Sequence, residues 1–264
     1  MMTDTITKGT LAIIGCKLFE DEMAYLLSRD QNLEHLIVVG GEDSEGISKK
    51  IGQMEHNFTV ETINEGDIPS EKITKGYSIL LWIKPMALHQ KPEKLNDDVT
   101  TTIRKVQGCC DAVLLFYGLC GNAFKNIEAV TQDFSVPVVI LRDRSGNIID
   151  DCIGAVLGGT VEYYEQLKKS SGTFFLTPMW ADNWRELFHK VQILPDSTDI
   201  EGAKYVFECV GYKNVIKLDT GLGDSEKFDA QINEFAEIFN FKKSVISCTT
   251  KVMEDSFDQA KRLL

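Results

Sequence analysis

Short apolar runs alternate with segments of helical periodicity along the whole chain, and this alternation restricts the fold more than any other feature. Runs such as Leu11–Gly15, His35–Val39 and Ala112–Tyr117 have the length and composition of strands buried on both faces. Between them, apolar residues recur every three or four positions, as in amphipathic helices. Strands that alternate with helices form parallel sheets with right-handed crossovers. The sequence therefore predicts an α/β fold with a mostly parallel, Rossmann-like sheet or sheets flanked by helices.

The same patterns predict where each element lies. Strands are expected at 11–15, 35–39, 58–63, 77–83, 112–117, 136–141, 173–177, 214–218 and 244–247. Helices are expected at 17–29, 96–107 with Asn96 as the N-cap, 125–132, 153–169 with a bend at Gly158-Gly159, 183–191, 200–210, 226–239 and from 253 onward. We expect an N-terminal α/β lobe at 1–165 and a C-terminal α/β lobe at 166–264, or one sheet shared by both.

Charge and composition exclude several classes of function. The 264 residues include 40 acidic and 28 basic side chains, for a net charge of −12, which repels nucleic acid and anionic lipid. No apolar stretch is long enough to span a bilayer. The N-terminal segment lacks the cationic start and apolar core of a secretion signal. We therefore expect a cytoplasmic protein that binds neither nucleic acid nor membranes.

Seven cysteines are the most informative chemical feature. A reducing cytoplasm keeps thiols free, so these residues are not expected to form a disulfide scaffold. Cys16, Cys120 and Cys152 each follow a predicted strand, at the edge of the sheet where parallel α/β folds place their sites. Cys16 and Cys152 also begin predicted helices, whose partial positive charge favours thiolate. The alternative is that single cysteines pack as small buried hydrophobes, which we expect for Cys109, Cys110 and Cys209.

Three thiolates from separate loops fit a metal site that is assembled by tertiary folding. Such a set can hold zinc with an open position, or a four-iron cluster with one iron left without a protein ligand. The sequence does not choose between these two cofactors. A fourth ligand is expected from His89, in an exposed loop, ahead of Cys248, which follows the last predicted strand.

Other side chains near the predicted strand ends extend this site. Asp150 and Asp151 precede Cys152, where one carboxylate caps the helix and the other can orient a ligand or substrate. We assign the catalytic role to Asp151 together with Arg142, whose guanidinium can bind an anionic substrate. Trp180 can serve as an aromatic lid, although packing is the commoner role of such a residue.

Familiar enzyme motifs are absent. The chain lacks the G-x-G-x-x-G dinucleotide turn, the phosphate loop, the G-x-S-x-G elbow and the H-E-x-x-H zinc helix. Its one Asp-Thr-Gly sequence supplies a single carboxylate where aspartic proteases need two. A methyltransferase that uses S-adenosylmethionine remains a weaker alternative, because Gly40-Gly41 lies in a suitable region but the first predicted turn has little glycine.

Three motifs carry a resemblance to a known family. They are Ile14-Gly-Cys16, Tyr117-Gly-Leu-Cys-Gly121, and Asp150-Asp-Cys-Ile153 followed by Leu157-Gly-Gly159. With them the chain resembles domain of unknown function 1638, a family of methanogenic archaea and other anaerobes whose members often lie beside corrinoid-dependent methylamine methyltransferase systems. The chain departs from the family pattern at Asp151, which replaces a common histidine, and at Arg142, which is displaced by a longer loop.

The resemblance implies a role in anaerobic one-carbon metabolism. We expect a metal-dependent enzyme or accessory factor with a small-molecule substrate, in which Tyr117, Gly118, Gly121 and Trp180 contact the cofactor. A corrinoid is a further candidate cofactor, and a corrinoid protein or methyltransferase is a candidate partner. The alternative is a non-enzymatic module that binds a corrinoid or a partner and whose cysteines are only structural.

Overall fold

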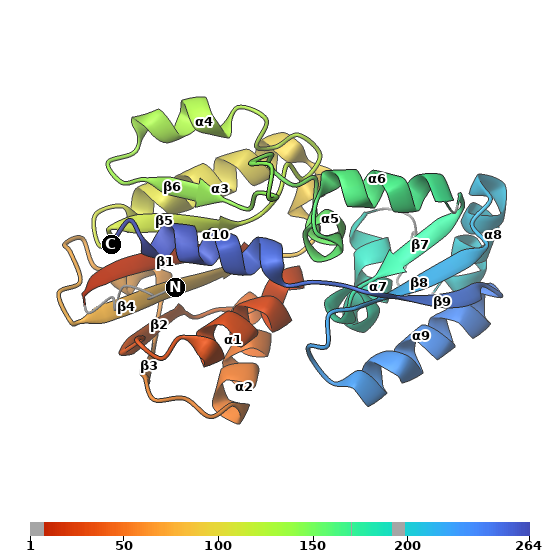
Figure 1. Cartoon of the computed structure of the whole chain (residues 1–264), viewed down its shortest axis with the longest axis horizontal. Helices are drawn as coiled ribbons and strands as arrows, with labels where there is room; N and C mark the ends of the chain where they lie inside the picture. The colour runs from red at the N-terminus through yellow and green to blue at the C-terminus, as the bar shows by residue number, and fades with distance from the viewer. Residues whose placement is uncertain (1–7, 170, 192–198) are drawn as a thin grey trace.

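The structure is a computed structural model that describes residues 8–169, 171–191 and 199–264, and it confirms the α/β fold with parallel sheets (Figure 1). The first sheet has the order β3-β2-β4-β1-β5-β6 and the second has the order β7-β8-β9. All strand pairs in both sheets are parallel. The strands are β1 (Gly9–Cys16), β2 (His35–Val39), β3 (Thr59–Ile63), β4 (Tyr77–Lys84), β5 (Ala112–Phe116), β6 (Val138–Ile140), β7 (Thr173–Leu176), β8 (Asn214–Asp219) and β9 (Lys242–Ser247).

Helices cover both faces of the first sheet. The α-helices are α1 (Glu20–Arg29), α2 (Glu45–Gln53), α3 (Pro92–Val106), α4 (Ile127–Val130), α5 (Cys152–Leu157), α6 (Thr160–Lys169), α7 (Pro178–Lys190), α8 (Ile200–Val210), α9 (Ser225–Phe239) and α10 (Lys251–Lys261). Right-handed crossovers place α1 and α2 on one face, and α3 and α4 on the other, because the chain moves toward opposite edges of the sheet. The central strands are therefore buried on both sides, as their continuous apolar sequences indicate.

The second sheet has a core of its own, which is rich in aromatic rings. Phe174, Trp184, Phe188, Phe207 and Phe235 lie within this core, with many edge-to-face contacts between neighbouring rings. The last helix, α10, leaves the second sheet and returns to the first, where it packs on β5 and β6 and contacts α1 (Figure 1). The chain therefore passes between the two sheets twice, once before α6, which contacts β7 through Tyr163 and Phe175, and once after β9.

The structure corrects several predicted element boundaries. Helix α3 begins at Pro92, the first-turn position that tolerates proline, and Asn96 instead donates its side-chain amide to the Ala123 carbonyl at 2.8 Å. The segment predicted as one helix at 153–169 is divided into α5 and α6, because Gly158 and Gly159 adopt φ angles of 101° and 153°. The helix expected at 125–132 contains only the short α4 and a following 3-10 turn.

The second lobe differs from its prediction at two points. Helix α7 begins at Pro178 rather than at residue 183, since Thr177 caps it by accepting a hydrogen bond from the Trp180 backbone N–H. Cys209 is exposed on α8, so its predicted place in the core is wrong. Among the described residues, no helix combines the length and the apolar composition that crossing a bilayer requires.

Candidate functional site

Three cysteines from three separate segments line one cavity of about 210 Å³ between the two sheets. Cys16 is the last residue of β1, Cys120 lies in the loop after β5, and Cys152 is the first residue of α5. The same cavity is lined by six other residues that the sequence predicts for the site: His89, Tyr117, Gly121, Asp150, Asp151 and Trp180. The strand ends therefore meet as the parallel topology requires.

Gly118 allows the loop of Cys120 to approach the segment before Cys152. A Cβ atom at Gly118 would lie 2.5 Å from the Ile149 carbonyl oxygen, a distance that packed side chains do not tolerate. Beyond the glycine, the Leu119 and Cys120 backbone N–H groups donate to the Ile149 and Asp150 carbonyls, both at 2.8 Å. Gly118 does not itself line the cavity. Its role is to allow the close contact between these two backbone segments.

The backbone of Cys120 is held in an unfavourable conformation. Its φ of 45° lies in the left-handed region, which costs a residue with a Cβ atom about 1–3 kcal/mol. Gly121 and Asn122 follow with φ angles of 70° and 69°. This run of left-handed residues turns the chain sharply after β5, so that the Cys120 side chain lies beside the cavity instead of continuing along the strand.

Asp151 fixes the start of α5 and so the position of Cys152. One of its carboxylate oxygens accepts hydrogen bonds from the Ile153 and Gly154 backbone N–H groups, both at 2.9 Å. The capping role that the sequence allows for one of the two aspartates therefore belongs to Asp151. Burial raises the pKa of the Asp151 carboxyl, while these hydrogen bonds favour the charged form.

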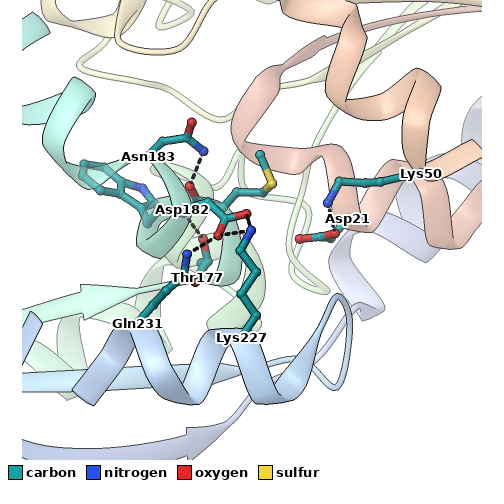
Figure 2. Close-up of polar contacts among 9 residues, drawn as sticks. Asp21, Lys50, Thr177, Asp182, Asn183, Lys227 and Gln231 are labelled. Carbon is teal, nitrogen blue, oxygen red and sulfur yellow. Dashed lines mark hydrogen bonds and ion pairs between the residues drawn. The ribbon is translucent and has the colours of Figure 1, made fainter. Parts of the chain in front are cut away.

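Trp180 reaches the cavity from the second lobe. Its indole Nε1–H donates to the Cys152 Sγ at 3.4 Å. Two residues further along α7, Asp182 is bound by Lys227 of α9 at 2.7 Å and by the Gln231 side chain (Figure 2). The Asp21–Lys50 pair of the first lobe lies beside this group in the same view. The contacts of Asp182 tie the first turns of α7, and therefore Trp180, to α9, and α7 also packs against α1 of the first lobe.

Burial strongly disfavours the charged form of all three thiols. It raises the pKa of the Cys16 thiol to about 11 and raises the pKa values of Cys120 and Cys152 still further, since the charge of Cys16 adds to the effect of burial at Cys120 and the charge of Asp151 does so at Cys152. Burial lowers the pKa of His89, which keeps its imidazole neutral near pH 7. The cavity therefore holds protonated thiols beside a neutral imidazole, and only a nearby positive charge would make the thiolates favourable.

Tyr117 supplies the cavity with an unsatisfied polar group. Its side chain is 2% exposed, and its hydroxyl has no hydrogen-bond partner among the described residues. A buried hydroxyl without a partner costs about 1–3 kcal/mol, a cost that a bound molecule can remove. Burial also raises the pKa of Tyr117, so this hydroxyl remains a donor at every physiological pH.

Besides Gly118, two residues predicted for the site lie outside it. Arg142 pairs with Glu128 at 2.7 Å and donates to the Gly146 carbonyl at 2.8 Å, and it does not line the cavity. Cys248 does not line the cavity either, although it follows β9 as expected. Cys109 and Cys110 are fully buried in the main core.

Apolar residues form part of the cavity wall and were not singled out from the sequence. Leu18, Phe19 and Leu95 line it beside the thiols. In the sequence they carry only the periodicity of helix positions facing a core, and that signal is the same whether a residue faces a cavity or a packed interior. Their role becomes visible only when the loops are assembled.

The thiols share a cavity, but they do not converge on one point. Within residues 8–169, 171–191 and 199–264, no group of three or more His, Cys, Asp or Glu side chains is placed so that it could hold a metal ion.

A comparison with protein families identifies the relatives of this chain. Residues 83–257, about two thirds of the chain, match the sequence model of a family described as "Protein of unknown function (DUF1638)". The chain belongs to this family. The match contains Cys120, Cys152 and Trp180, whereas Cys16 lies outside it. Comparisons with curated proteins and with solved structures gave no match.

Proposed function

We propose that this protein is a metal-dependent enzyme or accessory factor that holds zinc or an iron–sulfur cluster through Cys16, Cys120 and Cys152. The observation that carries the proposal is that thiols from three separate segments, with His89 beside them, line one cavity. Soft thiolates and a neutral imidazole are the donors that zinc and iron–sulfur clusters prefer. A bound cation also offsets the electrostatic cost of three adjacent thiolates.

The size of the cavity restricts the substrate. A volume of about 210 Å³ is below the roughly 300–1,000 Å³ of pockets that enclose drug-sized ligands. A small molecule fits beside the thiols, whereas a corrinoid macrocycle could reach them only from outside. The roles in one-carbon or methylamine metabolism and the corrinoid partner stay predictions that rest on the resemblance.

The chain's own residues would orient such a substrate. When bound, the metal would supply a Lewis acid with an open position for the substrate. Tyr117 would donate a hydrogen bond to a substrate oxygen or nitrogen, since its hydroxyl has no other partner among the described residues. Trp180 closes the cavity from the second lobe and orients Cys152, and Asp151 holds the turn from which Cys152 projects.

The test is the metal and acid-labile sulfide content of protein purified without oxygen. We expect a stoichiometric metal in the wild type that is lost in both Cys120→Ser and Cys152→Ala. The exposed Cys209 provides a matched control, and Cys209→Ser should keep the metal. About four irons and four sulfides per chain would indicate a cluster, and one zinc would indicate a mononuclear site.

The alternative is a non-enzymatic binding module with structural cysteines. The observation that favours it is that no group of metal-ligating side chains among the described residues is already placed to hold a metal ion. The alternative predicts a metal-free wild type and variants that remain folded by circular dichroism. That result would refute the metal proposal.

A further inference from the structure

A second hollow adjoins the cysteine cavity and differs from it in charge. Its volume is about 270 Å³, and it shares Pro85 and Leu88 with the cavity. Three lysines line this hollow: Lys91 and Lys94 at the start of α3 in the first lobe, and Lys190 at the end of α7 in the second. We refer to it as the lysine hollow.

Two of the three lysines of the lysine hollow have no ion-pair partner among the described residues. Its lining contains no carboxylate among the described residues, and neither Lys91 nor Lys94 forms an ion pair with any of them. Within the described part of the chain, Lys190 forms an ion pair only with Glu186, one turn earlier on α7, at 2.7 Å, and its charge also acts on the Asp43 carboxyl. In a chain with a net charge of −12, three lysines gathered around one hollow produce a local positive potential opposite to that of the whole molecule.

The backbone of the hollow supports the same interpretation. Ala87 lines it with a φ of 65°, a left-handed conformation that is unfavourable for alanine and is typical of binding sites. Helix α3 starts beside it at Pro92, and no side chain in the described ranges caps this 15-residue helix. The first turn of α3 also carries the exposed Glu93, which does not line the hollow, so the positive charge in this space comes from the lysine ammonium groups.

We propose that the lysine hollow binds an oxyanion group, a phosphate or a carboxylate, of the small molecule that occupies the adjoining cavity. Lysines from both lobes would contact this group, so the bound molecule would link the lobes across the cavity mouth. The cavity lining contains no lysine or arginine of the described residues, so a substrate with a charged end would place that end outside, in the lysine hollow. The assignment of the oxyanion to the cavity's ligand rests on the proposed function, whereas anion binding by the hollow does not.

The test uses inorganic phosphate as the probe, at constant ionic strength maintained with chloride. Binding is followed by the backbone amide signals of Gln90, Lys91 and Lys94 in two-dimensional ¹H–¹⁵N spectra. We expect saturable shifts at these residues. Lys91→Gln/Lys94→Gln should weaken binding about tenfold, because two charged donors are lost. Acetate in place of phosphate distinguishes a carboxylate subsite from a phosphate subsite.

Two further variants distinguish a specific loss of phosphate binding from a general effect of charge or a loss of folding. Lys168→Gln/Lys169→Gln removes the same charge from the exposed end of α6, and it should change phosphate affinity less than about twofold. Glu186→Gln frees Lys190 from its exposed partner and should strengthen binding about two- to fivefold, a gain that a loss of folding cannot produce. Equal weakening by both double-lysine variants, or shifts outside the hollow, would overturn the proposal.

The outcome is separable from that of the metal site. Phosphate binding should survive in Cys120→Ser, and metal content should survive in Lys91→Gln/Lys94→Gln. Phosphate binding by a metal-free protein would support anion binding by the lysine hollow and refute the metal proposal. A bound metal without phosphate or acetate binding would support the metal proposal and refute anion binding by the hollow.

Discussion

The buried carboxyl of Glu22 should make the protein less stable as the pH rises. Glu22 lies in the first turn of α1 and is 2% exposed, and its Oε2 has no hydrogen-bond partner among the described residues. Burial is the main cause that raises its pKa from 4.5 to about 8, with a smaller contribution from Asp21 and an opposing one from Lys50. The folded chain therefore holds a proton that the unfolded chain releases at a much lower pH.

The sign and size of the effect follow from this difference. Between about pH 4.5 and about pH 8 the folded state binds more protons than the unfolded state, so the free energy of unfolding falls as the pH rises. At about 1.4 kcal/mol for each unit of pKa, the loss between about pH 5 and about pH 9 amounts to about 4 kcal/mol. Water that enters when the helix end opens locally makes this value an upper limit.

Glu22→Gln removes the titration and keeps the shape of the side chain. Its free energy of unfolding, measured by urea denaturation, should match that of the wild type near pH 5 and exceed it by several kcal/mol near pH 9. Glu45→Gln, at an exposed position in the first turn of α2, is the control and should leave the pH dependence unchanged. Parallel stability curves for the wild type and Glu22→Gln would show that Glu22 is charged in the folded protein, and the reasoning would be wrong.

Two further substitutions test contacts that hold the architecture together. Lys261→Met removes the 2.6 Å ion pair of Asp30, whose side chain is 2% exposed. It should lower the free energy of unfolding, measured in urea, by about 3 kcal/mol or more. Lys251→Met, at a more exposed ion pair, should change this free energy by less than about 1 kcal/mol. Gly118→Ala should lower it by about 1–3 kcal/mol and reduce any metal content, because the added methyl group meets a carbonyl oxygen. Gly52→Ala is the control: its methyl group meets no other atom, and alanine has the higher helix propensity, so the free energy of unfolding should rise by about 0.5–1 kcal/mol. A similar gain for Gly118→Ala would contradict the close contact at Gly118.

The sequence predicted the fold because its strands are buried on both faces. In a chain of alternating elements, continuous apolar runs such as 35–39 and 112–116 predict strands buried on both faces, and the structure confirms both strands. Helix boundaries were less predictable. Asn96 has the chemistry of an N-cap, yet its amide binds a carbonyl of another loop, and tertiary contacts of this kind leave no local signal.

The candidate site was predictable only in part, because contacts between distant segments leave no signal in the local sequence. Positions directly after strands were identifiable, since the end of a parallel strand fixes the edge on which the next residues lie, and Cys16, Cys120 and Cys152 do share one cavity. Arg142 also follows a strand, but its side chain turns away to Glu128. The direction of a long side chain depends on neighbours that are distant in sequence, and periodicity does not report them.

The location of the cavity follows from the way the chain connects its two sheets. The ends of β1 and β5 from the first sheet and of β7 from the second meet at one junction, so residues after all three strands line the same space. Because α10 returns to the first sheet, the second sheet is attached by two crossings rather than by one flexible linker. Helix α10 also packs against α5, which begins with Cys152, and its last residue, Lys261, forms an ion pair with Asp30. We therefore expect the contact between Trp180 and Cys152 to respond to the position of α10. A substitution at Lys261, remote from the thiols, should therefore also disturb the fluorescence of Trp180, in proportion to the loosening of α10.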